Sequence, residues 1–152
     1  MKLERIYISP GHNFFGRHGK TPDDHPVLEI EEVECVAGSG LRGDRFFNYR
    51  PDYKGQVTFF SCEVHDDVCT RFQLADLDPW AYRRNLLVSG IDLNALIGKE
   101  FAVQGVRFLG VVEASPCAWM NQAVAEGAED FLKGRGGLRA KILTDGMLRT
   151  EA

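Results

Sequence analysis

The chain has 152 residues, of which 44% are hydrophobic and 26% are charged, and this composition excludes collagen, coiled coil and wholesale disorder. The length predicts a single domain over residues 1–152. The formal net charge is −4, and without a basic block such an acidic chain is not expected to bind nucleic acids in general.

The N-terminal third is predicted to contain strands and one long loop. Residues 3–8 end in β-branched and aromatic residues, which favours a first strand. Residues 9–26 are rich in glycine and proline and predict a loop that is long for a compact domain. Residues 27–37 alternate with one slip of register, which predicts one long strand or two strands separated by a bulge. The next strand is predicted over 56–60.

Capping signals predict helices in the middle of the chain. Ser61 is expected to cap a helix over 62–72, because its side chain can accept a hydrogen bond from the first turn. An aspartate followed by proline is expected to start a short helix over 78–82. A strand over 85–89 and a further turn or two of helix over 91–97 follow.

The C-terminal third predicts two hairpins and one helix. Residues 99–114 read as a hairpin around the Gln104-Gly105 turn. A helix is predicted over 118–133 and a second hairpin over 138–149. Strands therefore outnumber helices. We expect a mostly β, β-rich α+β fold, in the form of a closed or partly closed β-barrel with a few peripheral helices.

The sequence favours a cytoplasmic protein that does not enter the membrane. No apolar run approaches the ~18 residues that a membrane-spanning helix needs. The N-terminus is charged from the second residue, so it has no signal-peptide core. The chain has no CxxC motif, and free thiols are expected at its four cysteines, Cys35, Cys62, Cys69 and Cys117.

Cys117 carries the sharpest chemical signal, because it lies between a predicted strand and a predicted helix. Ser115 is a good N-cap and Pro116 a good first helical residue, which would place Cys117 in the first turn of that helix. There the helix dipole would lower the pKa of the thiol and favour a thiolate, which is both a nucleophile and a soft metal ligand. The alternative is an inert, buried cysteine, and position alone leaves both open.

Two glycine-rich loops that carry arginines indicate an anionic ligand. They are residues 40–45, with Arg42 and Arg45, and residues 134–139, with Arg135 and Arg139. Either loop alone is better explained as a tight turn with solvated arginines, but together with Arg83-Arg84-Asn85 they favour an anion site. Asp44 is expected to order its own turn by accepting backbone N–H bonds rather than to act as a catalytic acid.

Two groups of possible metal ligands are better explained without a metal. The loop over 9–26 carries His12, His18 and His25. Their spacing matches no known ligand pattern, so we expect a solvent-exposed loop. One face of the helix over 62–72 carries Cys62, His65 and Cys69. A fourth ligand is not indicated, so we expect this face to pack against the rest of the protein. The alternative is that His65 acts as a general base.

Several short motifs, weak alone, become specific through their order. They are Gly40–Phe46, Gln56-Val57-Thr58, Arg84-Asn85-Leu86, Ser89–Leu93, Leu96-Ile97-Gly98, Pro116-Cys117 and Gly136–Ala140. This combination, over roughly residues 27–149, resembles the MOSC family. The family takes its name from the C-terminal domain of molybdenum cofactor sulfurase.

The resemblance implies a β-barrel-type fold that binds the molybdenum cofactor, a pterin with a dithiolene and a phosphate. It makes Cys117 the functional cysteine, either as a thiolate ligand to molybdenum or as the carrier of a persulfide sulfur. Certain members of the family reduce N-hydroxylated compounds at the metal. The residues expected to hold the cofactor or an oxyanion substrate are Arg42, Asp44, Arg45, Arg84, Asn85, Arg135 and Arg139.

The resemblance also implies dependence on a partner protein. Pyridoxal phosphate is mentioned for the family because larger relatives carry a cysteine desulfurase domain, and none is expected to bind this chain of 152 residues. Sulfur would come from a donor protein, and electrons from another, since no iron–sulfur spacing or flavin fingerprint appears. Three hypotheses follow: a molybdenum-dependent oxidoreductase, a sulfur carrier, and a non-catalytic cofactor-binding module.

Overall fold

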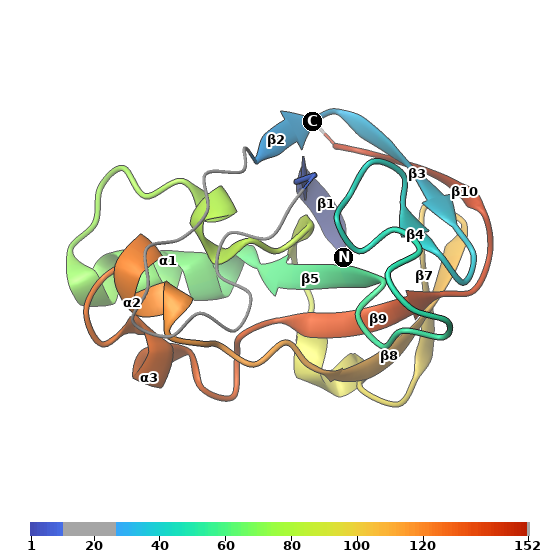
Figure 1. Ribbon diagram of the computed structural model, residues 1–152. Coiled ribbons are helices and arrows are strands. Elements are labelled where there is room, and N and C mark those ends of the chain that lie inside the picture. The colour runs from blue at the N-terminus through green and yellow to red at the C-terminus, as the bar shows by residue number, and fades with distance from the viewer. Residues whose placement is uncertain (11–26, 152) are drawn as a thin grey trace.

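The computed structural model describes residues 1–10 and 27–151, which are arranged in three layers (Figure 1). The middle layer is a seven-stranded sheet with the order β2-β1-β6-β5-β9-β8-β7. Its strands are β1 (Lys2–Ile8), β2 (Leu28–Ile30), β5 (Val57–Ser61), β6 (Leu86–Ser89), β7 (Glu100–Val103), β8 (Val106–Glu113) and β9 (Leu138–Ile142). A three-stranded sheet covers one face, with the order β10 (Gly146–Arg149), β3 (Glu32–Val36) and β4 (Gly40–Leu41).

Short helices gather at the other face of the large sheet (Figure 1). They are α1 (Cys62–Phe72), η1 (Pro79–Tyr82), α2 (Trp119–Ala123) and α3 (Ala128–Leu132), and a further 3-10 turn, η2 (Leu93–Leu96), follows β6. The capping predictions for α1 and η1 are confirmed. The Ser61 hydroxyl accepts a bond from the Val64 N–H at 3.2 Å, and Asp78 caps η1 by accepting from the Trp80 N–H at 3.2 Å.

The central strands are apolar on both faces because each lies between two hydrophobic cores. Phe59 of β5 packs into the core between the sheets, whereas its neighbour Phe60 packs into the core beneath the helices. Leu86 and Leu87 of β6 divide in the same way. Side chains that alternate along a strand point to opposite faces, so these two strands anchor both outer layers.

The prediction of a closed barrel is wrong. Within the described residues, β2 and β7 form the two edges of the large sheet and do not pair with each other, and the three-stranded sheet is separate. The mostly β content with few helices is as expected. Barrel closure depends on how strands distant in sequence pair, which local patterns do not encode.

Two local predictions in the C-terminal third are also wrong. The helix over 118–133 is interrupted, because Gly127 takes a φ of 91° and separates α2 from α3. The hairpin over 138–149 does not form: β9 pairs with β5 and β8, whereas β10 pairs with β3. The β7–β8 hairpin and the division of 27–37 into β2 and β3 are confirmed.

Some expectations fall on residues that the structure does not describe. The loop over 9–26 and its histidines, His12, His18 and His25, lie almost entirely outside the described residues. In the ranges 1–10 and 27–151, no helix combines the length and apolarity needed to cross a bilayer.

Candidate functional site

The thiol of Cys117 is exposed on the loop between β8 and α2. The other three cysteines are buried or half-buried, and all four are free. The predicted helix start is wrong: α2 begins at Trp119 and has five residues, so Ser115 and Pro116 do not cap it. Cys117 instead precedes the helix, and its carbonyl oxygen accepts a bond from the Met120 N–H at 3.0 Å. The alternative of a buried thiol is excluded by this exposure.

The segment that carries Cys117, residues 113–117, packs directly against residues 134–137, and we call these two segments the cysteine loop and the glycine loop. The Ala114 N–H donates to the Gly137 carbonyl at 2.9 Å, and the Gly136 N–H donates to the Glu113 carboxylate at 3.1 Å. A Cβ added at Gly136 would lie 2.3 Å from the Ala114 carbonyl oxygen. Glycine is therefore required here for close contact between two backbones.

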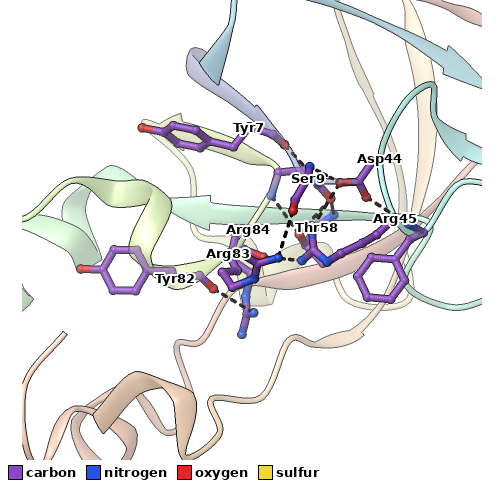
Figure 2. Close-up of polar contacts among 10 residues, drawn as sticks. Tyr7, Ser9, Asp44, Arg45, Thr58, Tyr82, Arg83 and Arg84 are labelled. Carbon is purple, nitrogen blue, oxygen red and sulfur yellow. Dashed lines mark hydrogen bonds and ion pairs between the residues drawn. The ribbon is translucent and has the colours of Figure 1, made fainter. Parts of the chain in front are cut away.

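Arg84 links the two loops through backbone carbonyl oxygens. Its Nε donates to Gly136 at 3.0 Å and its Nη1 to Tyr82 at 3.2 Å, as Figure 2 shows for Tyr82. Its Nη2 donates to Ala114 at 2.9 Å and to Ser115 at 3.4 Å. The guanidinium thus bonds to both loops and to the chain just before β6.

The charges of Arg139, Arg45 and Cys117 all act on Arg84, and we call Arg84, Arg139 and Arg45 the cationic cluster. The pKa of Arg84 is lowered to about 10, mainly by burial and also by the nearby charges of Arg139 and Arg45, while Cys117 and Glu113 act in the opposite direction. Like charges disfavour the protonated form, and a thiolate or carboxylate favours it. An anion bound here would therefore stabilise the cluster.

Arg139 is the member of the cluster that is available to a ligand. It lies on β9, opposite Thr58 of β5, and its side chain is half-buried. A Cβ on Gly55 would meet the Cδ of Arg139 at 3.5 Å and the ring of Tyr53 at 3.1 Å, so both side chains crowd this glycine. Among the described residues its guanidinium has no hydrogen-bond or ion-pair partner.

Asp44 and Arg45 point toward each other close to Ser9 (Figure 2). Their side chains are 0% and 9% exposed and form an ion pair at 3.2 Å. The Asp44 carboxylate also accepts from the N–H groups of Ser9 at 3.0 Å and Phe46 at 3.3 Å, which confirms that it orders its own turn. Arg45 donates to the Arg83 carbonyl at 3.0 Å. Burial lowers the pKa of Arg45, and Asp44 partly offsets this.

Asn85 is buried and joins neighbouring strands. Its side-chain oxygen accepts from the Thr58 N–H at 3.0 Å and from the Thr58 hydroxyl at 3.1 Å. Its side-chain nitrogen donates to the Tyr7 carbonyl at 3.1 Å. These bonds fix the start of β6 between β1 and β5, so Asn85 positions its neighbour Arg84.

Arg42 and Arg135 are engaged in exposed ion pairs instead. Arg42 pairs with Glu34 at 2.8 Å and Arg135 with Asp67 at 3.3 Å. Arg135 also lines a pocket of about 450 Å³, which is bordered by the start of α1 and the segment from Gly90 to Asn94. Cys117 is not part of the lining of that pocket.

Comparison with known proteins identifies the family. The family model for the MOSC domain matches residues 40–151. The chain belongs to the MOSC domain family. No match is found among curated proteins.

Solved structures share the fold at low sequence identity. YuaD from Bacillus subtilis superposes with a TM-score of 0.76 at 17% identity, covering 98% of this chain and 91% of its own. YiiM from Escherichia coli has a TM-score of 0.66 at 16% identity, and the match covers 98% of this chain and 66% of the YiiM chain. YiiM from Geobacillus stearothermophilus gives 0.68 at 10% identity, covering 97% and 70%. At these identities the likeness establishes the fold of the MOSC domain.

Two residues of this MOSC domain contribute to the cluster without having been singled out in the sequence. Glu113 accepts from the glycine loop and favours the charged form of Arg84. Tyr53 favours the charged form of Arg45. Glu113 lies near the end of a predicted strand, four residues before the cysteine, which is the one local signal that points to it. Tyr53 has no such signal, since its role depends on the folded path of residues 42–55.

His65 belongs to a packed helix face, as expected. Its Nδ1 lies 2.8 Å from the Tyr82 hydroxyl, and its Nε2 lies 3.6 Å from the Cys69 sulfur. Burial lowers the pKa of His65. Across the part of the chain that the structure describes, no cluster of histidine, cysteine and carboxylate side chains could hold a metal ion.

We expect His65 to make the stability of the MOSC domain pH-dependent. The pKa of His65 is lower in the folded state than in the unfolded state, so the unfolded chain binds the proton more readily. The contribution of neutral His65 to the free energy of unfolding is therefore present above about pH 6.5 and is lost as the pH falls. The free energy of unfolding, measured with urea, should fall less between pH 7.5 and pH 5.5 for His65→Gln than for the wild type. Equal losses in the two proteins would contradict this role.

Proposed function

We propose that this MOSC domain binds the molybdenum cofactor beside the cysteine loop, with the Cys117 thiolate as a ligand to molybdenum. The observation that carries the proposal is the exposed Cys117 thiol within electrostatic reach of the Arg84 guanidinium. A thiolate is a soft donor suited to such a metal.

The residues of the cluster fit the anionic parts of the cofactor. Arg139, whose guanidinium has no acceptor in the described part of the chain, would hold the pterin phosphate, because the fork of an arginine matches phosphate oxygens. Asp44, Arg45 and Asn85 are buried and would hold the site together from behind. We leave Arg42 and Arg135 outside the binding set, since an anion would first have to displace their carboxylate partners.

When bound, the cofactor supplies redox chemistry at molybdenum, and we propose the reduction of N-hydroxylated compounds as the reaction. In this chain, Cys117 would bind the metal and Arg139 would orient the cofactor. Electrons would come from a partner protein. The four free cysteines support a reducing compartment, and we therefore place the protein in the cytoplasm.

The test is molybdenum analysis of the whole chain purified from two hosts, one that makes the cofactor and one that is blocked in its synthesis. We expect near-stoichiometric molybdenum from the first host and background levels from the second. Background molybdenum from both hosts would contradict cofactor binding.

A second candidate function, that of a sulfur carrier, is supported by the exposure of Cys117 relative to the other cysteines. The Cys117 thiolate would attack the outer sulfur of a donor persulfide, form a new S–S bond and release the donor as a thiolate. Intact mass spectrometry after incubation with a desulfurase and cysteine should then show one added sulfur at Cys117. Sulfur spread over all four cysteines would argue against this function.

A further inference from the structure

We propose that Arg84 is a positioning residue, which holds the cysteine loop against the glycine loop and thereby fixes Cys117 relative to the cationic cluster. Its importance for metal ligation rests on the proposed function. The positioning itself is a property of the protein without cofactor, and it can be tested in that form.

The hydrogen-bonding capacity of Arg84 is almost fully used within the protein. A guanidinium has five N–H donors, and the four bonds to Gly136, Tyr82, Ala114 and Ser115 leave one N–H of Nη1 for any ligand. Arg139, in contrast, has no acceptor among residues 1–10 and 27–151. The two arginines therefore differ: Arg139 keeps its donors available for a ligand, whereas Arg84 uses its donors to hold the backbone.

The cysteine loop depends on bonds of this kind. Pro116 immediately precedes Cys117 and has no N–H to donate. Next to Cys117, the cysteine loop is therefore held to Arg84 through the carbonyl groups of Ala114 and Ser115. Both accept from Arg84. On the other loop, the same guanidinium bonds to the Gly136 carbonyl, and the adjacent Gly137 is packed so closely that a Cβ there would lie 2.3 Å from the Phe59 carbonyl oxygen.

Lysine cannot reproduce this arrangement although it carries the same charge. Its ammonium is a compact point charge with three donors, whereas the planar guanidinium directs donors to several acceptors at once. Arg84→Lys therefore separates the positioning role from the charge. Arg107→Lys is the matched control, because Arg107 lies on β8 in an exposed ion pair with Glu100.

The first readout is amide hydrogen exchange of the cofactor-free chain. Because a hydrogen bond from a charged donor contributes about 1.5–3 kcal/mol, the amides of Ala114 and Gly136 should exchange at least about tenfold faster in Arg84→Lys. The β7–β8 hairpin amides should be unchanged, and so should all amides in Arg107→Lys. Wild-type exchange at Ala114 and Gly136 in Arg84→Lys would overturn the proposal.

The second readout reports the surroundings of Cys117 directly. The ratio of its alkylation rates with iodoacetate and with iodoacetamide measures the local positive field, because one reagent is anionic and the other is neutral. We expect this ratio to fall several-fold in Arg84→Lys although no charge is lost, and to stay unchanged in Arg107→Lys. An unchanged ratio in Arg84→Lys would show that the positive charge of residue 84, and not its hydrogen bonds, sets the surroundings of Cys117, and would overturn the proposal.

A third measurement needs no variant, so it remains informative if Arg84→Lys does not fold. In the wild type at increasing urea below the unfolding transition, the amides of Ala114 and Gly136 should open together with one urea dependence, as a single cooperative unit. Separate urea dependences would overturn the proposal. Neither result depends on whether the protein binds molybdenum.

Discussion

Replacing Cys117 with serine is expected to reduce the molybdenum content of the protein, purified from a cofactor-competent host, at least about tenfold. A serine hydroxyl is a hard, neutral donor, whereas the thiolate is the soft ligand that suits molybdenum. Loss of outer-shell partners alone typically costs about 10–100-fold in metal affinity, and the loss of a direct ligand should cost no less. Metal analysis by mass spectrometry, relative to protein concentration, provides the measurement.

The control for this experiment is Cys69→Ser, which removes a thiol of similar chemistry on α1. Cys69 is half-buried and lies beside His65 rather than beside the arginine cluster, so its variant should retain the wild-type molybdenum content. If Cys117→Ser also retains it, the cofactor is held without the thiolate, and Cys117 is not a metal ligand.

Replacing Asp44 with alanine is expected to destabilise the fold by about 3–5 kcal/mol, because it removes one partner of a buried ion pair. The Arg45 side chain is 9% exposed and would remain charged inside the protein without its carboxylate. The same substitution would also leave the N–H groups of Ser9 and Phe46 without their acceptor. Urea unfolding at neutral pH measures the change in the free energy of unfolding.

Glu34→Ala is the matched control, since it removes the carboxylate partner of Arg42, which lies three residues before Arg45. That pair is exposed on both sides, with side-chain exposures of 60% and 40%, and exposed pairs contribute about 0–1 kcal/mol. A similar loss of stability in the two variants would show that the burial of Asp44 does not set the strength of its pair.

The elements that the sequence predicted well are those defined by neighbouring residues. Ser61 caps α1 and Asp78 caps η1 through bonds that span two or three residues. The β7–β8 hairpin is fixed by its own two-residue turn. The sequence instead predicted that β9 and β10 pair with each other. They pair with strands distant in sequence, because contacts in the shared hydrophobic core determine their partners.

At the site, the sequence likewise indicated which residues are involved, but not what each of them does. Cys117, Arg84 and Arg139 were singled out from their motifs, and in the structure the charges of Cys117 and Arg139 both act on Arg84. Arg42 and Arg45 occupy the same glycine-rich turn, yet one is exposed and the other is buried. Contacts from Ser9 and Arg83, which are distant in sequence, make that difference, and no spacing within the turn predicts it.

The position of β9 has a consequence for the order in which the molecule is made. This strand comes late in the chain, yet it lies between β5 and β8 in the middle of the large sheet. It also carries Arg139 and follows directly after the glycine loop. During synthesis the cysteine loop therefore leaves the ribosome before the glycine loop that supports it, so any ligand of the proposed site can meet the finished site only after β9 has emerged.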